Sequence, residues 1–367
     1  MKSGTCCAPM ATRTSATSGG RGVSFRVSFA LLASPGRAAI LALALAAGAQ
    51  FAWAQPAPAP VPPAVPRDPV VAARILALDP DHLSDDDVRD ILAHAPAPRI
   101  VALQGSLAFV TMEPFGEFLV AMGYPAERIR NPRDGTMSWS SFGSSAALAG
   151  SLAWFYEREG MMPLLIGHSQ GGMLAIRTLY ELAGAFAESI PVTNPLTGET
   201  EPRTAIVDPQ TGAPRPVVGL KVPYAAALAT GKLPRLLLGQ WSMLARLRHI
   251  PDTAVEFTGF SFGFDPIAGE FGGPDPYVAT GSAIVRNVTL PASYTHVGLP
   301  DTRHLALDAG TRAWINAYVP GAPAAALPTD ADTTNILHAA DLWFSVKKHW
   351  CLEAQRAIRA GRPDAPR

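Results

Sequence analysis

Hydrophobic residues follow two different patterns that alternate along most of the chain. Continuous apolar runs of strand length predict buried strands at 99–103, 163–166, 217–229, 253–264 and 282–290. Between these runs, apolar periodicity or helix-forming composition predicts helices over 114–122, 145–159, 172–182, 233–247, 309–318 and 335–360. Ser84 and Asp87 have the spacing of a capping box, which predicts one more short helix. Strands that alternate with helices predict an α/β fold, with a mostly parallel sheet flanked by helices.

The alternation is interrupted between the helix over 172–182 and the strand that follows it. Two similar turn sequences, NPLTG at 194–198 and DPQTG at 208–212, are flanked by short strand-like runs. Proline, glycine and Asn or Asp at these positions favour tight turns. We therefore expect an inserted β-hairpin over about 190–220.

The N-terminal part of the chain differs in composition from the rest. Residues 37–54 combine a basic flank, a short apolar run and the ending Ala52-Trp53-Ala54, which is the pattern of a signal peptide, here with a long leader before it (1–54 together). The apolar run is short for a membrane span, which needs about 20 residues. We therefore expect an exported protein, periplasmic or secreted, with no stable membrane span after cleavage. The remaining organisation is predicted as a Pro/Ala-rich tether, a folded domain, and a linker with a C-terminal helix, over 55–75, 76–320 and 321–367.

Charge and cysteine content exclude several classes of function. The chain has 30 basic and 30 acidic residues and no basic run interleaved with aromatic residues, which argues against a nucleic-acid partner. No cluster of histidine, cysteine or carboxylate residues has metal-ligand spacing, and no glycine-rich phosphate loop is present, so we expect no metal and no cofactor. Cys351 is alone after the signal region, which predicts a packing role and no internal disulfide.

The most informative stretch is MMPLLIGHSQGGMLAIRTLYEL at 161–182. An apolar strand leads directly into Gly167-His168-Ser169-Gln170-Gly171, and a helix follows without a break. A residue at such a sharp strand-to-helix turn is held in a strained backbone conformation, and its neighbours must be small. Ser169 would project its hydroxyl above the sheet, close to the positive end of the following helix.

This stretch resembles the nucleophile elbow of the α/β-hydrolase family, and GHSQGG is a form common among the lipases and esterases of that family. The resemblance covers about 99–318 and implies the α/β-hydrolase fold, with Ser169 as nucleophile. It also implies that an acidic residue follows a later strand and that a histidine follows the last strand. In this fold, an insertion such as 190–220 often covers the active site, so a lid is one interpretation of it and a surface ornament is the other.

The acid and the base each have more than one candidate. Asp265, in the sequence GFDPI directly after a strand, resembles the acid of the family, and Asp252 and Asp275 are the alternatives. His296, in the loop after the last strand, resembles the catalytic histidine, and His304 is the alternative base.

The resemblance also implies two backbone donors for an oxyanion hole. One is the N–H group of Gln170, directly after the serine. The other lies in the loop after the strand at 99–103, where Ser106 or its neighbour Leu107 is the candidate. Gln104 stands in this loop at the position where the family usually has the histidine of a His-Gly pair.

These features predict an exported serine hydrolase that cleaves acyl or lipid esters through a Ser-His-Asp triad. Its partner would be a small-molecule or lipid ester. An acyltransferase or thioesterase would use the same triad and is the first alternative. From another class, a catalytically silent hydrolase fold that only binds ligands is the second alternative.

Overall fold

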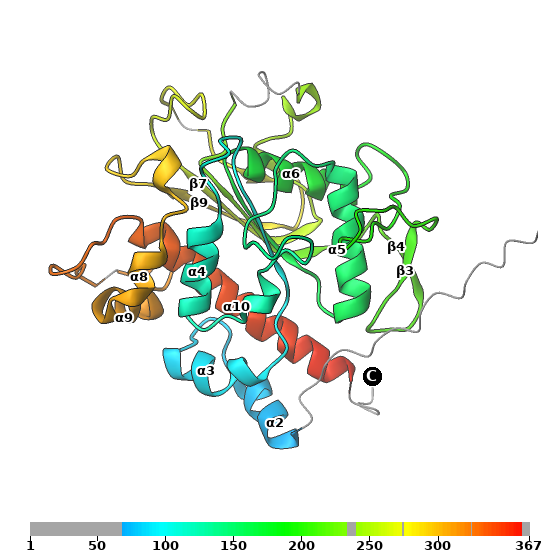
Figure 1. Cartoon of the computed structure of the whole chain (residues 1–367), viewed down its shortest axis with the longest axis horizontal. Helices are drawn as coiled ribbons and strands as arrows, with labels where there is room; N and C mark the ends of the chain where they lie inside the picture. Colours follow the sequence, from blue (N-terminus) through cyan, green and yellow to red (C-terminus); the bar gives the residue numbers. More distant parts are fainter. Residues whose placement is uncertain (1–67, 233–239, 274, 324, 362–367) are drawn as a thin grey trace, which may run out of the picture. The chain divides into compact units, whose positions relative to one another are not determined.

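A computed structural model describes residues 68–361, apart from 233–239, 274 and 324. At its centre is a five-stranded sheet in which all neighbouring strands are parallel (Figure 1). In spatial order the strands are β1 (Ile100–Leu103), β2 (Leu164–His168), β5 (Val222–Leu228), β7 (Ala254–Ser261) and β9 (Ile284–Thr289). The predicted α/β architecture with a mostly parallel sheet is therefore confirmed.

Alternate residues of each strand point to opposite sides of the sheet, and helices bury the side chains on both faces. In β1, Ile100 and Ala102 belong to one buried apolar cluster, whereas Val101 and Leu103 belong to the other. The cluster of Val101 is completed by α5 (Ser145–Glu159) and α6 (Gln170–Leu182). The cluster of Ile100 is completed by α4 (Glu113–Ala121), α8 (Arg303–Leu307), α9 (Ala309–Ala317) and α10 (Ile336–Ala360).

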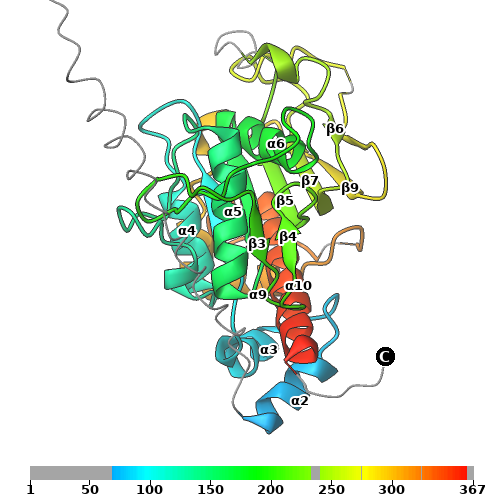
Figure 2. The same cartoon turned by 90° about the vertical axis from the view of Figure 1, so that its right-hand side faces the viewer.

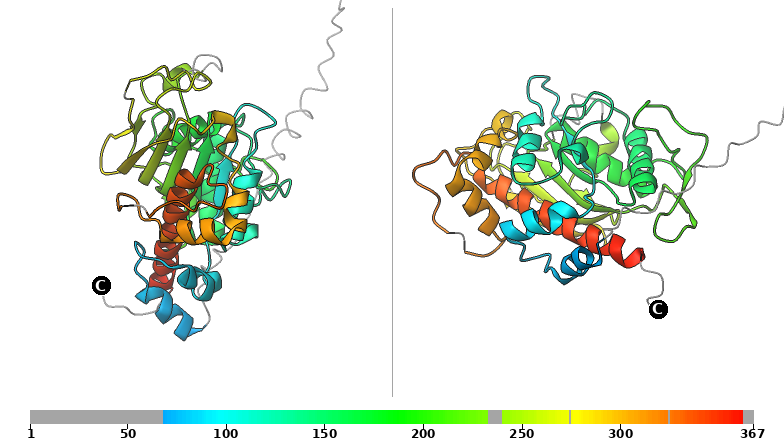
Figure 3. Two further views of the ribbon diagram at one scale, coloured as in Figure 1. Left: turned by 90° about the vertical axis from the view of Figure 1, so that its left-hand side faces the viewer. Right: turned by 60° about the horizontal axis from the view of Figure 1, so that its bottom comes forward.

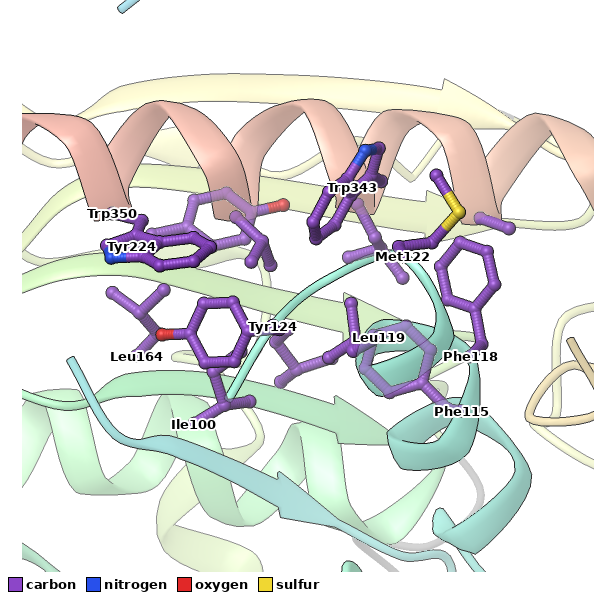
Figure 4. Close-up of a cluster of buried hydrophobic side chains, with 14 of the residues drawn as sticks. Ile100, Phe115, Phe118, Leu119, Met122, Tyr124, Leu164, Tyr224, Trp343 and Trp350 are labelled. Carbon is purple, nitrogen blue, oxygen red and sulfur yellow. The ribbon is translucent and has the colours of Figure 1, made fainter. Parts of the chain in front are cut away.

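The helix α10 forms a large part of one core. It runs across the face of the sheet opposite to α5 (Figure 3). Its Trp343 and Trp350 are completely buried among side chains from the sheet and from α4 (Figure 4), and the ring centroid of Trp350 lies 4.9 Å from that of Tyr124. Cys351 is buried in the same helix, as its expected packing role requires. The C-terminal segment is thus an integral part of the domain core.

Within the described residues, the short α-helices α2 and α3 precede the sheet, and α2 corrects the sequence-based organisation. The helix α3 (Asp85–Asp90) begins with the predicted capping box of Ser84 and Asp87. The helix α2 (Pro69–Ala77), however, lies where the Pro/Ala-rich tether was expected to continue to residue 75. Proline is well accommodated in a first helical turn, so the composition did not exclude this helix. The rest of the predicted tether and the predicted signal peptide lie outside the described residues.

The segment inserted after α6 contains the expected hairpin. Its strands β3 (Ala205–Val207) and β4 (Pro214–Pro216) pair antiparallel. Arg203 forms two hydrogen bonds with the carboxylate of Glu157 in α5, at 2.8 and 2.6 Å, and the backbone N–H of Val207 donates to the same group at 2.6 Å. These bonds hold the insertion beside α5 (Figure 2), so we do not assign it as a lid.

The segment between β5 and β7 differs from its prediction. Residues 233–239 of the helix expected over 233–247 lie outside the described residues. The described remainder forms a 3₁₀ turn, Trp241–Met243, and irregular turns, followed by β6 (His249–Ile250), which pairs with β8 (Val278–Ala279).

Among the described residues, no helix has both the length and the apolar character needed to cross a bilayer.

Candidate active site

Ser169 occupies the tight turn between β2 and α6. Its dihedral angles, φ 53° and ψ −117°, lie in a region that residues with a Cβ atom rarely adopt. Two residues at the end of β5 hold this conformation. The N–H group of Ser169 donates to the carbonyl oxygen of Leu228 at 2.8 Å, and its carbonyl oxygen accepts from the hydroxyl of Thr230 at 2.9 Å. A strained residue that its surroundings hold in this way is a candidate for function.

The glycines of the motif are needed because the backbone passes so close to itself. A Cβ atom on Gly167 would lie 2.3 Å from the carbonyl carbon of Gly171. A Cβ atom on Gly171 would lie 2.2 Å from the carbonyl oxygen of Leu103, in β1. Both contacts are with backbone atoms, which cannot rotate away, so any side chain at these positions would open the turn.

Loops from two other strands bring His296 and Asp265 to Ser169. The strands are parallel, so the loops after β2, β7 and β9 leave the same edge of the sheet. The Nε2 atom of His296 lies 2.9 Å from Oγ of Ser169, and its Nδ1 atom lies 2.6 Å from Oδ2 of Asp265. All three residues are buried, with between 4% and 7% of their surface exposed. The structure therefore joins three of the candidate residues in one chain of hydrogen bonds.

Asp265 determines which nitrogen of His296 carries the proton. A carboxylate only accepts hydrogen bonds, so Nδ1 is protonated and Nε2 accepts from the Ser169 hydroxyl. Burial by itself would raise the pKa of Asp265. The bond to His296 and the backbone N–H groups of Ile267 and Ala268, both 3.1 Å from Oδ1, nevertheless hold this pKa below its ordinary value. The arrangement can move the hydroxyl proton to an imidazole that a carboxylate orients.

The alternative acid and base candidates lie elsewhere. His304 is in α8, and its Nε2 atom lies 3.8 Å from a carboxylate in the segment before α10. Asp252 accepts a hydrogen bond from the backbone just before β9, and Asp275 pairs with an arginine at 2.8 Å. Of the sequence-derived candidates for acid and base, Asp265 and His296 are thus the two that the structure brings to the serine.

The candidate oxyanion donors come from two segments close to Ser169. Gln170 is the first residue of α6, and the first N–H groups of a helix have no acceptor within it. The loop after β1 also comes close to Ser169, because a Cβ atom on Gly105 would lie 3.2 Å from Cβ of Ser169. Ser106 follows directly in this loop and is half-buried. Gln104, where the resemblance implied a histidine, accepts a hydrogen bond from the hydroxyl of Ser138 at 2.8 Å.

His168 has a more specific place than the sequence indicated. Its ring is buried, and its Nε2 atom lies 2.8 Å from the backbone carbonyl oxygen of His296. Burial, together with the neighbouring His296, lowers the pKa of His168 to about 3, so the ring is neutral near pH 7. The pattern of the motif contains no signal for this contact, because the two residues are far apart in the sequence.

A cavity of about 510 Å³ lies next to His296 and Asp265. Asp265 and His296 themselves form part of its wall, and most of the rest is apolar, with Phe262, Phe264 and Leu290 among the lining residues. Such a mixture of an apolar wall with a few polar groups is typical of a small-molecule site.

The chain matches no protein-family model, and no curated protein or solved structure is significantly similar to it. Within the described residues, no group of three or more histidine, cysteine or acidic side chains has an arrangement that could hold a metal ion.

Proposed function

We propose that this protein is a serine hydrolase of the α/β-hydrolase fold that cleaves carboxylic esters. Ser169 is the nucleophile, His296 is the general base, and Asp265 orients the histidine. The observation that carries the proposal is the chain of hydrogen bonds from Ser169 through His296 to Asp265, with separations of 2.9 and 2.6 Å. The strained turn that presents Ser169 and the glycines that let it close support the same function.

In the proposed reaction, Oγ of Ser169 attacks the ester carbonyl carbon while Nε2 of His296 takes the hydroxyl proton. The negative charge that develops on the carbonyl oxygen is held by the backbone N–H groups of Gln170 and of Ser106. The imidazolium then gives its proton to the departing alcohol, which leaves an acyl-enzyme on Ser169. A water molecule, deprotonated by His296, attacks this acyl group; the imidazolium then returns the proton to Oγ of Ser169 as the bond to the acyl group breaks and the acid is released.

Exposed apolar side chains support acyl or lipid esters as substrates. Several large apolar residues in the loops beyond the carboxyl ends of the sheet strands are more than half exposed. They are Phe109, Phe142, Trp241, Phe264 and Phe271. These loops leave the same edge of the sheet as Ser169, so an acyl chain or a lipid surface that contacts them is close to the nucleophile. Substituting Phe264 and Phe271 with serine is expected to lower kcat/KM for long-chain esters more than for acetate esters. Ile284→Ser, at the opposite end of β9, is the matched control.

The decisive experiment measures hydrolysis of p-nitrophenyl esters of increasing acyl length, together with covalent labelling by a serine-directed phosphonate. Ser169→Ala should lose both activities, and His296→Ala should lower both by several orders of magnitude. His304→Ala is the matched control and should behave as wild type. A wild-type chain that neither hydrolyses any ester nor reacts with the phosphonate would refute the proposal and favour a silent binding fold.

The same experiment separates hydrolysis from acyl transfer. Phosphonate labelling at Ser169 without release of free acid from any ester would show that the site is reactive but the acceptor is not water. An acyltransferase or a thioesterase would then replace the ester hydrolase, and thioesters and alcohol acceptors would be the next substrates to measure.

The signal-peptide pattern of residues 37–54 supports export of this hydrolase. N-terminal sequencing of the mature protein tests this part of the proposal, and a start at Gln55 is the expected result.

A further inference from the structure

The turn that carries His296, residues 295–302, is held by side chains that the reaction does not use. Three buried side chains, those of His168, Asn335 and His338, donate hydrogen bonds to backbone carbonyl groups of this turn. The acceptors are the carbonyl oxygens of His296, Gly298, Leu299 and Asp301. His168 comes from the end of β2, whereas Asn335 and His338 come from the start of α10.

The side chain of Asn335 forms hydrogen bonds with this turn and does not cap its own helix. It is the N-cap residue of α10, where an asparagine side chain normally accepts from the first backbone N–H groups. Here it makes no such bond, and its amide donates to the carbonyl oxygens of Gly298 at 2.7 Å and Asp301 at 2.9 Å. Its φ angle is 70°, in the left-handed region that favours glycine, and the residue is only 2% exposed. Helix capping does not explain this conformation, but contact with the turn does.

The two histidines make one equivalent bond each. The Nε2 atom of His338 lies 2.8 Å from the carbonyl oxygen of Leu299, and that of His168 lies 2.8 Å from the carbonyl oxygen of His296. A carbonyl oxygen only accepts, so both rings carry a proton on Nε2. Burial lowers the pKa of His338 to about 4 and that of His168 to about 3, so both rings remain neutral near pH 7. Both act as fixed donors in this pH range.

We propose that His168, Asn335 and His338 are positioning residues, which hold the turn so that Nε2 of His296 stays within hydrogen-bond distance of Ser169. This inference rests on the proposed function of the triad. Proton transfer depends steeply on the separation of the two atoms, and a displacement of about 1 Å can lower a rate by about 10²-fold. The start of α10 therefore controls the rate of the reaction without touching the reacting atoms.

A pair of substitutions at position 338 tests this proposal. Glutamine and asparagine carry the same amide, but the amide nitrogen of glutamine reaches about as far as Nε2 of histidine, whereas that of asparagine is one methylene shorter. His338→Gln should keep kcat for a short-chain ester within about threefold of wild type. His338→Asn should lower kcat by about 10- to 100-fold and leave KM nearly unchanged. Asn335→Ala should behave like His338→Asn.

The control is the other histidine of α10, which is also buried. His349 is 3% exposed, and its Nε2 atom lies 3.2 Å from Oε2 of Glu256, in β7. His349→Asn also shortens a buried donor of α10, but this donor does not contact the turn of His296. It should lower the melting temperature while leaving kcat, measured well below that temperature, as in wild type.

The outcomes are distinct. A loss of kcat in His338→Asn that His338→Gln restores, with His349→Asn unaffected, supports the proposal. Wild-type kcat in His338→Asn, His338→Gln and His349→Asn would overturn it. Equal losses of kcat in these three variants would also overturn it, because the effect would then reflect a general weakening of α10. If the wild-type chain neither hydrolyses esters nor labels at Ser169, the proposed function itself fails and this inference falls with it.

Discussion

The strained backbone at Ser169 gives a prediction about stability that does not depend on the substrate. Ser169→Ala and Ser169→Gly both remove the hydroxyl that bonds to His296, but only glycine removes the Cβ atom that makes φ 53° and ψ −117° unfavourable. The difference between the two variants therefore isolates the backbone strain. Ser151, buried in the middle of α5, is the matched position with ordinary helical geometry.

The expected magnitude follows from three contributions. At Ser151, replacing alanine by glycine should destabilise the fold by about 1 kcal/mol through helix propensity and by about 0.8 kcal/mol through loss of a buried methyl group. At Ser169 a similar loss is offset by the release of about 1–3 kcal/mol of strain. The change in the free energy of unfolding from the alanine to the glycine variant should thus be more favourable at position 169 than at position 151 by about 2 kcal/mol, which corresponds to about 4 °C in melting temperature.

Urea denaturation and calorimetry of the four variants measure this difference directly. The two Ser169 variants should both be inactive, so activity does not bias the comparison. If the step from alanine to glycine has the same effect on stability at 169 and at 151, the turn stores no strain and the reasoning is refuted.

Three further predictions concern the packing around the site. In Gly172→Ala the new Cβ atom would lie 2.0 Å from Oγ1 of Thr230. This clash should lower the free energy of unfolding, measured by urea denaturation, by about 1–3 kcal/mol and should also lower kcat. Both losses should be smaller when Thr230→Ala is also present. Trp343→Ala should lower the free energy of unfolding by about 3–5 kcal/mol, and a loss below about 1 kcal/mol would contradict the core role of α10. The pKa values of His168 and His338 are lower in the folded than in the unfolded chain, so below pH 6.5 the unfolded chain binds more protons than the folded chain. The free energy of unfolding should therefore fall by about 1.4 kcal/mol per pH unit for each ring as the pH drops toward about 4. Urea midpoints measured over this pH range would show the slope.

Sequence reasoning predicted the parts of the molecule that depend on local rules. The glycine spacing around Ser169 and the change from strand to helix follow from backbone sterics within a few residues. Asp265 and His296 were candidates because the segments around them resemble the acid and histidine loops of the α/β-hydrolase family, and each follows a strand of a sheet whose parallel strands end at one edge.

Other features depend on contacts between distant segments, and the sequence did not show them. Residues 69–75 of α2 were included in the predicted Pro/Ala-rich tether, but Gln355 in α10 donates hydrogen bonds to the carbonyl oxygens of Ile75 and Leu78 at the C-terminal end of α2. The bond from His168 to the backbone of His296 joins residues on different strands. No pattern within one segment encodes such pairs.

The position of α10 late in the chain has a consequence for biosynthesis. During synthesis, Ser169, Asp265 and His296 emerge from the ribosome before α10 does. The turn of His296 and one core of the sheet nevertheless depend on that helix. Until α10 has docked, the nascent chain contains Ser169 but lacks the hydrogen bonds from Asn335 and His338 that hold the turn of His296. The proposed hydrolase activity should therefore begin only when synthesis has passed this helix.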